Sequence, residues 1–114
     1  MKIIVDAMGG DNAPSEIVKG AVEAVSERPD ITVCLTGQED IIKKELEKYT
    51  YKKEQIEIVP ASEVIETGEP PVNAIRKKKD SSIVVGMNLV KRGEADGFVS
   101  AGSSGAILVG GQVI

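Results

Sequence analysis

Apolar residues in this chain alternate between short continuous runs and longer stretches with helical spacing. Four short runs predict β-strands, and they fall at residues 3–5, 31–35, 56–59 and 97–99. Between the strands, apolar residues recur every three or four positions, as they do along one face of an amphipathic helix. The helices that this spacing predicts cover residues 14–28, 41–49, 71–79, 81–92 and 105–114.

The order of these elements is β-α-β-α-β-α-α-β-α. Strands that alternate with helices predict a mostly parallel sheet with helices on both faces. Residues 60–70, which include Gly68 and lead into Pro70-Pro71, predict a long loop before the third helix. No linker or internal repeat interrupts residues 1–114, so we expect them to belong to a single α/β domain.

Helix ends are marked by residue types with clear positional preferences. Pro14 suits the start of the first helix, and Pro29 ends it. Residues 80–82 are good N-cap residues for the fourth helix, and Gly93 suits the left-handed position after its end. The predicted helix 105–114 reaches the last residue without a charge or a stop signal, so we expect a truncated fold that continues beyond it.

Composition limits the kind of core and the kinds of partner. Aromatic residues make up only 3% of the chain, so the core must be aliphatic. The charged share of 28% and the apolar share of 41% are typical of a soluble globular protein. The net charge of −4 argues against nucleic-acid binding, which needs clustered Lys and Arg. The absence of His excludes Ser-His and Cys-His catalysis within these residues.

Cys34 is the single cysteine, so no disulfide can form within the chain, and we expect a reducing, cytoplasmic setting. Its place in a predicted buried strand indicates inert packing. The opening residues 1–6 reach an acid after only three apolar residues, too few for a signal-peptide core. Residues 97–114 are 18 uncharged positions, but eight are Gly or Ser, which favours a strand, a loop and a packed helix over a membrane span.

Two loops carry candidate chemistry, and each directly follows a predicted strand. In a parallel sheet both would lie at the carboxyl ends of their strands, where open α/β folds bind ligands. The loop after 97–99 has the composition of an anion cradle, because glycines let several N–H groups converge and the following helix adds its positive end. Its candidate phosphate-binding residues are Ser100, Gly102, Ser103, Ser104 and Gly105. A tight turn without a ligand would use the same residue types, and the spacing leaves both interpretations open.

The loop after 3–5 is rich in acids and glycines. Its candidate substrate-site residues are Asp6, Gly9, Gly10, Asp11 and Asn12. Two acids near a phosphate could hold a metal ion or orient a donor, or they could accept hydrogen bonds from N–H groups of the turn. We favour the turn-capping role for Asp11 and leave the role of Asp6 open. Neither a P-loop lysine nor a G-x-G-x-x-G motif is present, and we expect no metal and no cofactor.

A dense basic run consists of Arg76, Lys77, Lys78 and Lys79. Such runs are ordinarily solvated helix faces. The alternative is a docking surface for an acidic macromolecule or a phosphate.

Several blocks of the sequence resemble the phosphate:acyl-carrier-protein acyltransferases known as PlsX. These blocks are Val5-Asp6-Ala7-Met8-Gly9-Gly10-Asp11, Glu63-Val64-Ile65-Glu66, the run from Arg76 to Ser82, and Ser100-Ala101-Gly102. The similarity runs through the whole chain in the same order. The resemblance implies that these residues are the amino-terminal third of a family member.

The resemblance also implies a fold, a reaction and partners. The family fold is a three-layer α/β/α, doubly wound, mostly parallel sheet related to isopropylmalate dehydrogenases and phosphotransacetylases. The implied reaction transfers a long-chain acyl group from acyl carrier protein to inorganic phosphate, giving acyl phosphate for phospholipid synthesis. The implied enzyme is a cytoplasmic homodimer capable of peripheral membrane association, and its acidic carrier would dock on residues 76–79. The 114 residues alone are not expected to turn over substrate.

Two positions depart from the family pattern. Asn12 stands where the family usually has His, and an amide cannot act as a general base. Ser103-Ser104 stands where Asn-Thr is usual, and it keeps hydrogen-bonding capacity in a smaller form. Two other functions stay open: a phosphotransacetylase acting on acyl-coenzyme A, and a non-catalytic anion-binding α/β fragment.

Overall fold

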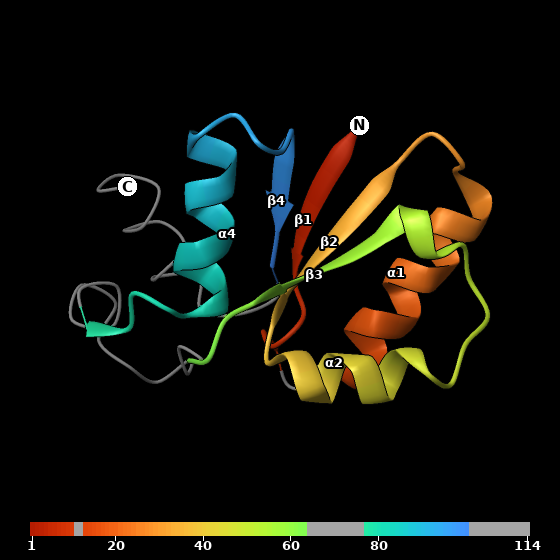
Figure 1. The fold of residues 1–114 in the computed structure, drawn as a ribbon, viewed down its shortest axis with the longest axis horizontal. Coiled ribbons are helices and arrows are strands. Elements are labelled where there is room, and N and C mark those ends of the chain that lie inside the picture. Colours follow the sequence, from red (N-terminus) through yellow and green to blue (C-terminus); the bar gives the residue numbers. More distant parts are fainter. Residues whose placement is uncertain (11–12, 64–76, 101–114) are drawn as a thin grey trace.

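A computed structural model describes residues 1–10, 13–63 and 77–100, and Figure 1 shows their arrangement. Its strands are β1 (Lys2–Asp6), β2 (Thr32–Gly37), β3 (Ile56–Pro60) and β4 (Gly97–Val99). They form one sheet in the order β3-β2-β1-β4, and every neighbouring pair is parallel. The four predicted strands and the parallel sheet are therefore confirmed.

The helices cover both faces of this sheet. Helices α1 (Ser15–Glu27) and α2 (Glu39–Leu46) lie on one face, and α4 (Ser82–Lys91) lies on the other (Figure 1). Right-handed crossovers explain the split, because the chain steps from β1 to β3 in one direction and then returns past β1 to β4. The connection from β3 to β4 runs in the opposite direction along the sheet, so its helix, α4, lies on the opposite face. The prediction of an α/β fold with helices on both faces is confirmed.

The larger core lies between the sheet and the α1–α2 face. It contains no aromatic side chain, as the composition predicted, and Tyr49 and Tyr51 pack only at its margin. Its aliphatic members come from both helices, from β2 and β3, and from the loop after β1. They are Ala7, Val18, Ala21, Val22, Val25, Val33, Leu35, Ile42, Leu46 and Ile56.

Helix α4 begins and ends as its sequence predicted. Ser81 is the N-cap residue, and its Oγ accepts a hydrogen bond from the Val84 N–H at 3.3 Å. At the other end Gly93 has a φ of 77°. The N–H groups of Gly93 and the next residue donate to the carbonyls of Val90 and Leu89, at 3.0 and 2.9 Å. These two bonds make a Schellman motif, which satisfies carbonyls that the helix leaves without partners.

The second helix differs from its prediction in two ways. Helix α2 ends at Leu46, so Tyr49 lies beyond it and reaches the core from the following turn. Ile41, which was predicted on the apolar face, is 39% exposed because Ile42 and Leu46 occupy the core positions. A 3₁₀ turn, η1 (Lys53–Gln55), precedes β3 and was not predicted.

Other predictions concern residues outside this description. The predicted helix 105–114 lies outside the described residues, and so do residues 71–76 of the predicted helix 71–79. Within the part of the chain that is described, no helix has both the length and the apolar character that crossing a membrane requires.

Candidate functional site

The loops after β1 and β4 begin side by side at the carboxyl edge of the sheet. The β1–β4 register pairs Val5 with Val99, so the next residues, Asp6 and Ser100, are neighbours. The Ser100 hydroxyl donates a hydrogen bond to Asp6 Oδ2 at 2.8 Å, across 94 positions of sequence. The last residue of β1 therefore contacts the first residue after β4, and the two loops that the sequence placed at one edge begin there. Phosphate binding there stays a prediction.

Asp6 is 1% exposed and uses both of its carboxylate oxygens. Oδ1 accepts a hydrogen bond from the Met8 N–H at 3.0 Å, which is the turn-capping role that the sequence allowed. Oδ2 accepts from Ser100 in the neighbouring loop. One side chain therefore fixes its own turn and connects that turn to a second one.

The loop after β1 is also held against β2. The Ala7 N–H donates to the Thr36 carbonyl at 3.0 Å. The Met8 side chain lies over Gly37, where an added Cβ would be 3.0 Å from the Met8 sulfur. A glycine at the end of β2 therefore leaves the space that Met8 occupies.

A row of polar side chains crosses three neighbouring strands at this edge. Thr36 pairs with Asp6 in the β1–β2 register, and Asp6 contacts Ser100. The Thr36 hydroxyl donates to the Ser82 carbonyl at 3.2 Å in a buried setting, which ties the start of α4 to the sheet. Thr36 was not among the site residues predicted from the sequence. A polar residue at the carboxyl end of an otherwise apolar buried strand is the signal that could have identified it.

Three helices begin at this edge, and each amino terminus carries a partial positive charge. Acidic residues in the first turns of α1 and α2 offset that charge, through Glu16 in α1 and Glu39 and Asp40 in α2. The first turn of α4 contains no acid, although Asp80 lies two residues before the helix begins.

The neighbouring part of the edge has a different character. A cleft of about 410 Å³ opens beside β3, and acids of α2 and Asp80 contribute to its lining. Ser62 donates to Asp80 Oδ2 through its N–H at 2.9 Å and through its hydroxyl, and these bonds lower the pKa of Asp80. Carboxylates on this side disfavour a phosphate, so the β1–β4 side is the better candidate.

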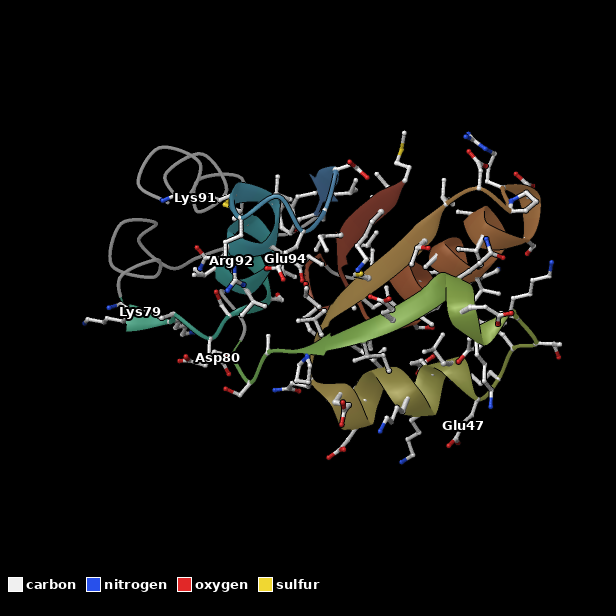
Figure 2. The ribbon with its side chains drawn as sticks, turned by 45° about the horizontal axis from the view of Figure 1, so that its top comes forward. Glu47, Lys79, Asp80, Lys91, Arg92 and Glu94 are labelled. Carbon is white, nitrogen blue, oxygen red and sulfur yellow. The ribbon has the colours of Figure 1, made fainter. Side chains whose placement is uncertain are left out.

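Three lysines of the basic run lie within the described residues, and two of them are exposed. Lys77 and Lys79 are exposed, and Lys78 is half-buried. Figure 2 shows Lys79 beside Asp80 on the α4 side of the molecule, far from Glu47 at the end of α2. Arg76 lies outside the described residues. The two exposed lysines fit both a solvated surface and a docking surface.

Several candidate site residues lie outside the described ranges, and their roles stay predictions. They are Asp11, Asn12, Gly102, Ser103, Ser104 and Gly105. Gly9 and Gly10 are described in the turn after β1, and Gly10 has a φ of 94°, which favours glycine. Within residues 1–10, 13–63 and 77–100, no group of three or more potential ligands is placed to hold a metal ion.

Cys34 is buried in β2 with its thiol 3.3 Å from Glu57 Oε2. Burial, together with the bond and charge of Glu57, raises the pKa of the thiol to about 11. The predicted burial of Cys34 is confirmed, and a thiol with this pKa is a poor nucleophile at neutral pH.

Comparison with known proteins identifies relatives along the entire chain. The sequence model of a family described as "Fatty acid synthesis protein" matches residues 1–114. A protein of Clostridium botulinum is 55% identical over 114 residues, which are all of this chain and 34% of the relative. A protein of Alkaliphilus oremlandii is 54% identical over 114 residues, again the whole chain and 34% of the relative. One of Halothermothrix orenii is 51% identical over 111 residues, 97% of the chain and 33% of the relative.

Each of these three relatives is named phosphate acyltransferase. The chain spans about a third of their length. With a family match over every residue and about half of the positions identical to these relatives, the chain belongs to the fatty acid synthesis protein family.

Proposed function

We propose that this chain contributes part of the active site of an enzyme that transfers an acyl group to inorganic phosphate. The donor in this proposal is long-chain acyl carrier protein, and the product is an acyl phosphate for phospholipid synthesis. The observation that carries the proposal is the hydrogen bond between Ser100 and Asp6, which brings the two candidate loops to one edge. The name shared by the relatives supports the reaction class.

In the proposed mechanism an oxygen of hydrogen phosphate attacks the thioester carbonyl carbon. A C–O bond forms, the C–S bond breaks, and the proton of the phosphate ends on the sulfur of the released carrier. No enzyme nucleophile is required, which agrees with a chain that has no His and whose one thiol is buried with a raised pKa. The protein would act by holding the reactants together and by stabilising the oxyanion with N–H groups.

The acidic carrier would approach the exposed lysines beside α4. Lys77 and Lys79 lie just before that helix, whose amino terminus is at the carboxyl edge. Opposite charges speed encounter and orient the partners even where they add little to affinity. We also propose, from the resemblance, a cytoplasmic homodimer with peripheral membrane association, which sedimentation and cell fractionation would check.

A chimera gives a direct test, because the chain covers only a third of its relatives. Residues 1–114 would replace the matching third of the Clostridium botulinum protein. With long-chain acyl carrier protein and phosphate, we expect acyl phosphate at a rate within about tenfold of that relative. Acyl-coenzyme A as donor would separate a small-molecule phosphotransacetylase from the carrier-dependent enzyme. A folded chimera that forms no acyl phosphate from either donor would contradict the proposal.

Binding can be tested on the 114-residue chain without turnover. We expect inorganic phosphate to move the amide resonances of Gly102 and Gly105, with sulfate as the competing anion. Unchanged resonances at millimolar phosphate would argue against the cradle. Acyl transfer by the chimera would then have to use another phosphate site.

A further inference from the structure

We infer that Asp6 is a positioning residue that fixes Ser100 and, through it, the start of the candidate phosphate loop. The inference rests on the proposed function for its effect on catalysis. Asp6 is 1% exposed, and each carboxylate oxygen has its own donor. The Met8 N–H lies 3.0 Å from Oδ1, and the Ser100 hydroxyl lies 2.8 Å from Oδ2. A single buried side chain thus connects the loop after β1 to the loop after β4.

The two contacts require a polar side chain that reaches both loops. Asn could keep both of them, because its carbonyl oxygen can accept from the Met8 N–H while its N–H₂ group donates to the Ser100 hydroxyl oxygen, which both donates and accepts. Replacement by Ala removes both acceptors. Because the site is buried, water does not readily replace them.

The bond lies where the strand pairing stops. The β1–β4 ladder has three register pairs and ends at Val5 and Val99. The Asp6–Ser100 bond extends the connection by one residue into the glycine-rich loop. Loss of the bond frees Ser100, the first residue of that loop, from the sheet edge.

Asp6 acts at a distance from the reacting atoms in this inference, so its loss should change phosphate binding more than the chemical step. In the chimera, we expect Asp6→Ala and Ser100→Ala each to raise the KM for phosphate about tenfold, with kcat within about threefold of the parent. The double variant should be no worse than Asp6→Ala, because that change already removes the bond between the two residues.

Different kinetics would overturn the inference. If Asp6→Ala lowers kcat more than about a hundredfold while Ser100→Ala resembles the parent, Asp6 contacts the reacting groups directly. Effects of the two changes that multiply in the double variant would show independent roles, and the positioning role would be wrong.

Asp96 provides a matched control at the other end of β1. Its Oδ2 accepts a hydrogen bond from the Lys2 N–H at 2.8 Å, so it makes the same kind of bond at the amino edge of the sheet. We expect Asp96→Ala, which removes this acceptor, to leave the KM for phosphate unchanged. An equal rise in KM for this variant would show that the loss of any hydrogen bond from a backbone N–H to a carboxylate has the effect.

A second measurement separates this inference from the proposed function. In the 114-residue chain, Ser100→Ala should move the Met8 amide resonance, because both groups bond to one carboxylate. The control Ser26→Ala removes a hydroxyl that bonds within α1 and should not move it. An unmoved Met8 resonance in Ser100→Ala would refute the link, whatever the chimera does. A moved resonance together with an inactive parent chimera would refute the acyltransfer proposal alone.

Discussion

Cys34, Glu57 and Lys2 form a cluster in which neighbouring strands change the chemistry of single side chains. Glu57 Oε2 accepts from the Cys34 thiol at 3.3 Å and lies 3.1 Å from Lys2 Nζ. The hydrogen bond from Cys34, followed by that from Lys2, lowers the pKa of Glu57. The same carboxylate adds to the effect of burial in raising the pKa of Cys34. Cys34, whose place in a buried strand predicted inert packing, is therefore held as a neutral thiol.

This cluster predicts a loss of stability in alkali. Cys34 holds its proton to a pKa of about 11 in the folded chain, against 9.0 for an ordinary thiol. Above pH 9 the unfolded chain releases the proton first, so the free energy of unfolding falls as the pH rises toward 11. Urea unfolding at pH 8, 9.5 and 11 should show a steeper fall for the parent chain than for Cys34→Ala. Equal slopes would show that the thiol does not contribute.

Among the elements, helix α4 approaches the sheet closely because Gly86 faces Phe98 of β4 and Ile4 of β1. A Cβ added at Gly86 would lie 2.8 Å from Phe98 Cδ1 and 3.1 Å from Ile4 Cγ2. Gly86 is a buried residue in the middle of α4, where glycine ordinarily lowers the stability of a helix relative to alanine. Close packing of this element against the two strands that lead into the site explains the glycine.

Two glycines in helices give opposite expectations for the same substitution. Gly86→Ala should destabilise the chain by about 1 to 3 kcal/mol, because overpacking outweighs the better helix propensity of Ala. Gly20 in α1 has nothing within 4 Å of an added Cβ. Gly20→Ala should therefore stabilise by up to about 1 kcal/mol. Thermal or urea unfolding of both variants measures the difference, and a stabilising Gly86→Ala would contradict the packing shown here.

For the whole molecule, the distribution of charge matters more than its sum. The net charge is −4, yet Lys77 and Lys79 are exposed just before α4. A local basic surface can attract an acidic partner in spite of a small net negative charge. The two lysines precede α4, which begins at Ser82.

Charge reversal tests that surface. In the chimera, Lys77→Glu with Lys79→Glu should weaken binding of acyl carrier protein about tenfold or more in low salt. The difference from the parent should shrink at high salt, where screening shortens the range of the interaction. Lys19→Glu, at an exposed position of α1 on the other face, is the matched control. An equal loss for Lys19→Glu would indicate a general charge effect in place of docking.

The sequence by itself determined the features that depend on neighbours along the chain. Apolar spacing identified all four strands, and it identified α1, α2 and α4 to within a few residues. The cap at Ser81 and the turn at Gly93 followed from residue type, because their bonds span only three to five positions. Family membership likewise followed from blocks of sequence, and the match over residues 1–114 confirmed it.

The tertiary structure alone decided which distant groups meet. Asp6 and Ser100 are 94 positions apart, and Thr36 and Ser82 are 46 apart, so no local pattern specifies either contact. The parallel register of β1 with β2 and β4 brings these side chains to one edge. The role of Asp6 was open in the sequence because a short carboxylate can cap its own turn or join another loop. Its burial at the point where the β1–β4 ladder ends lets it do both.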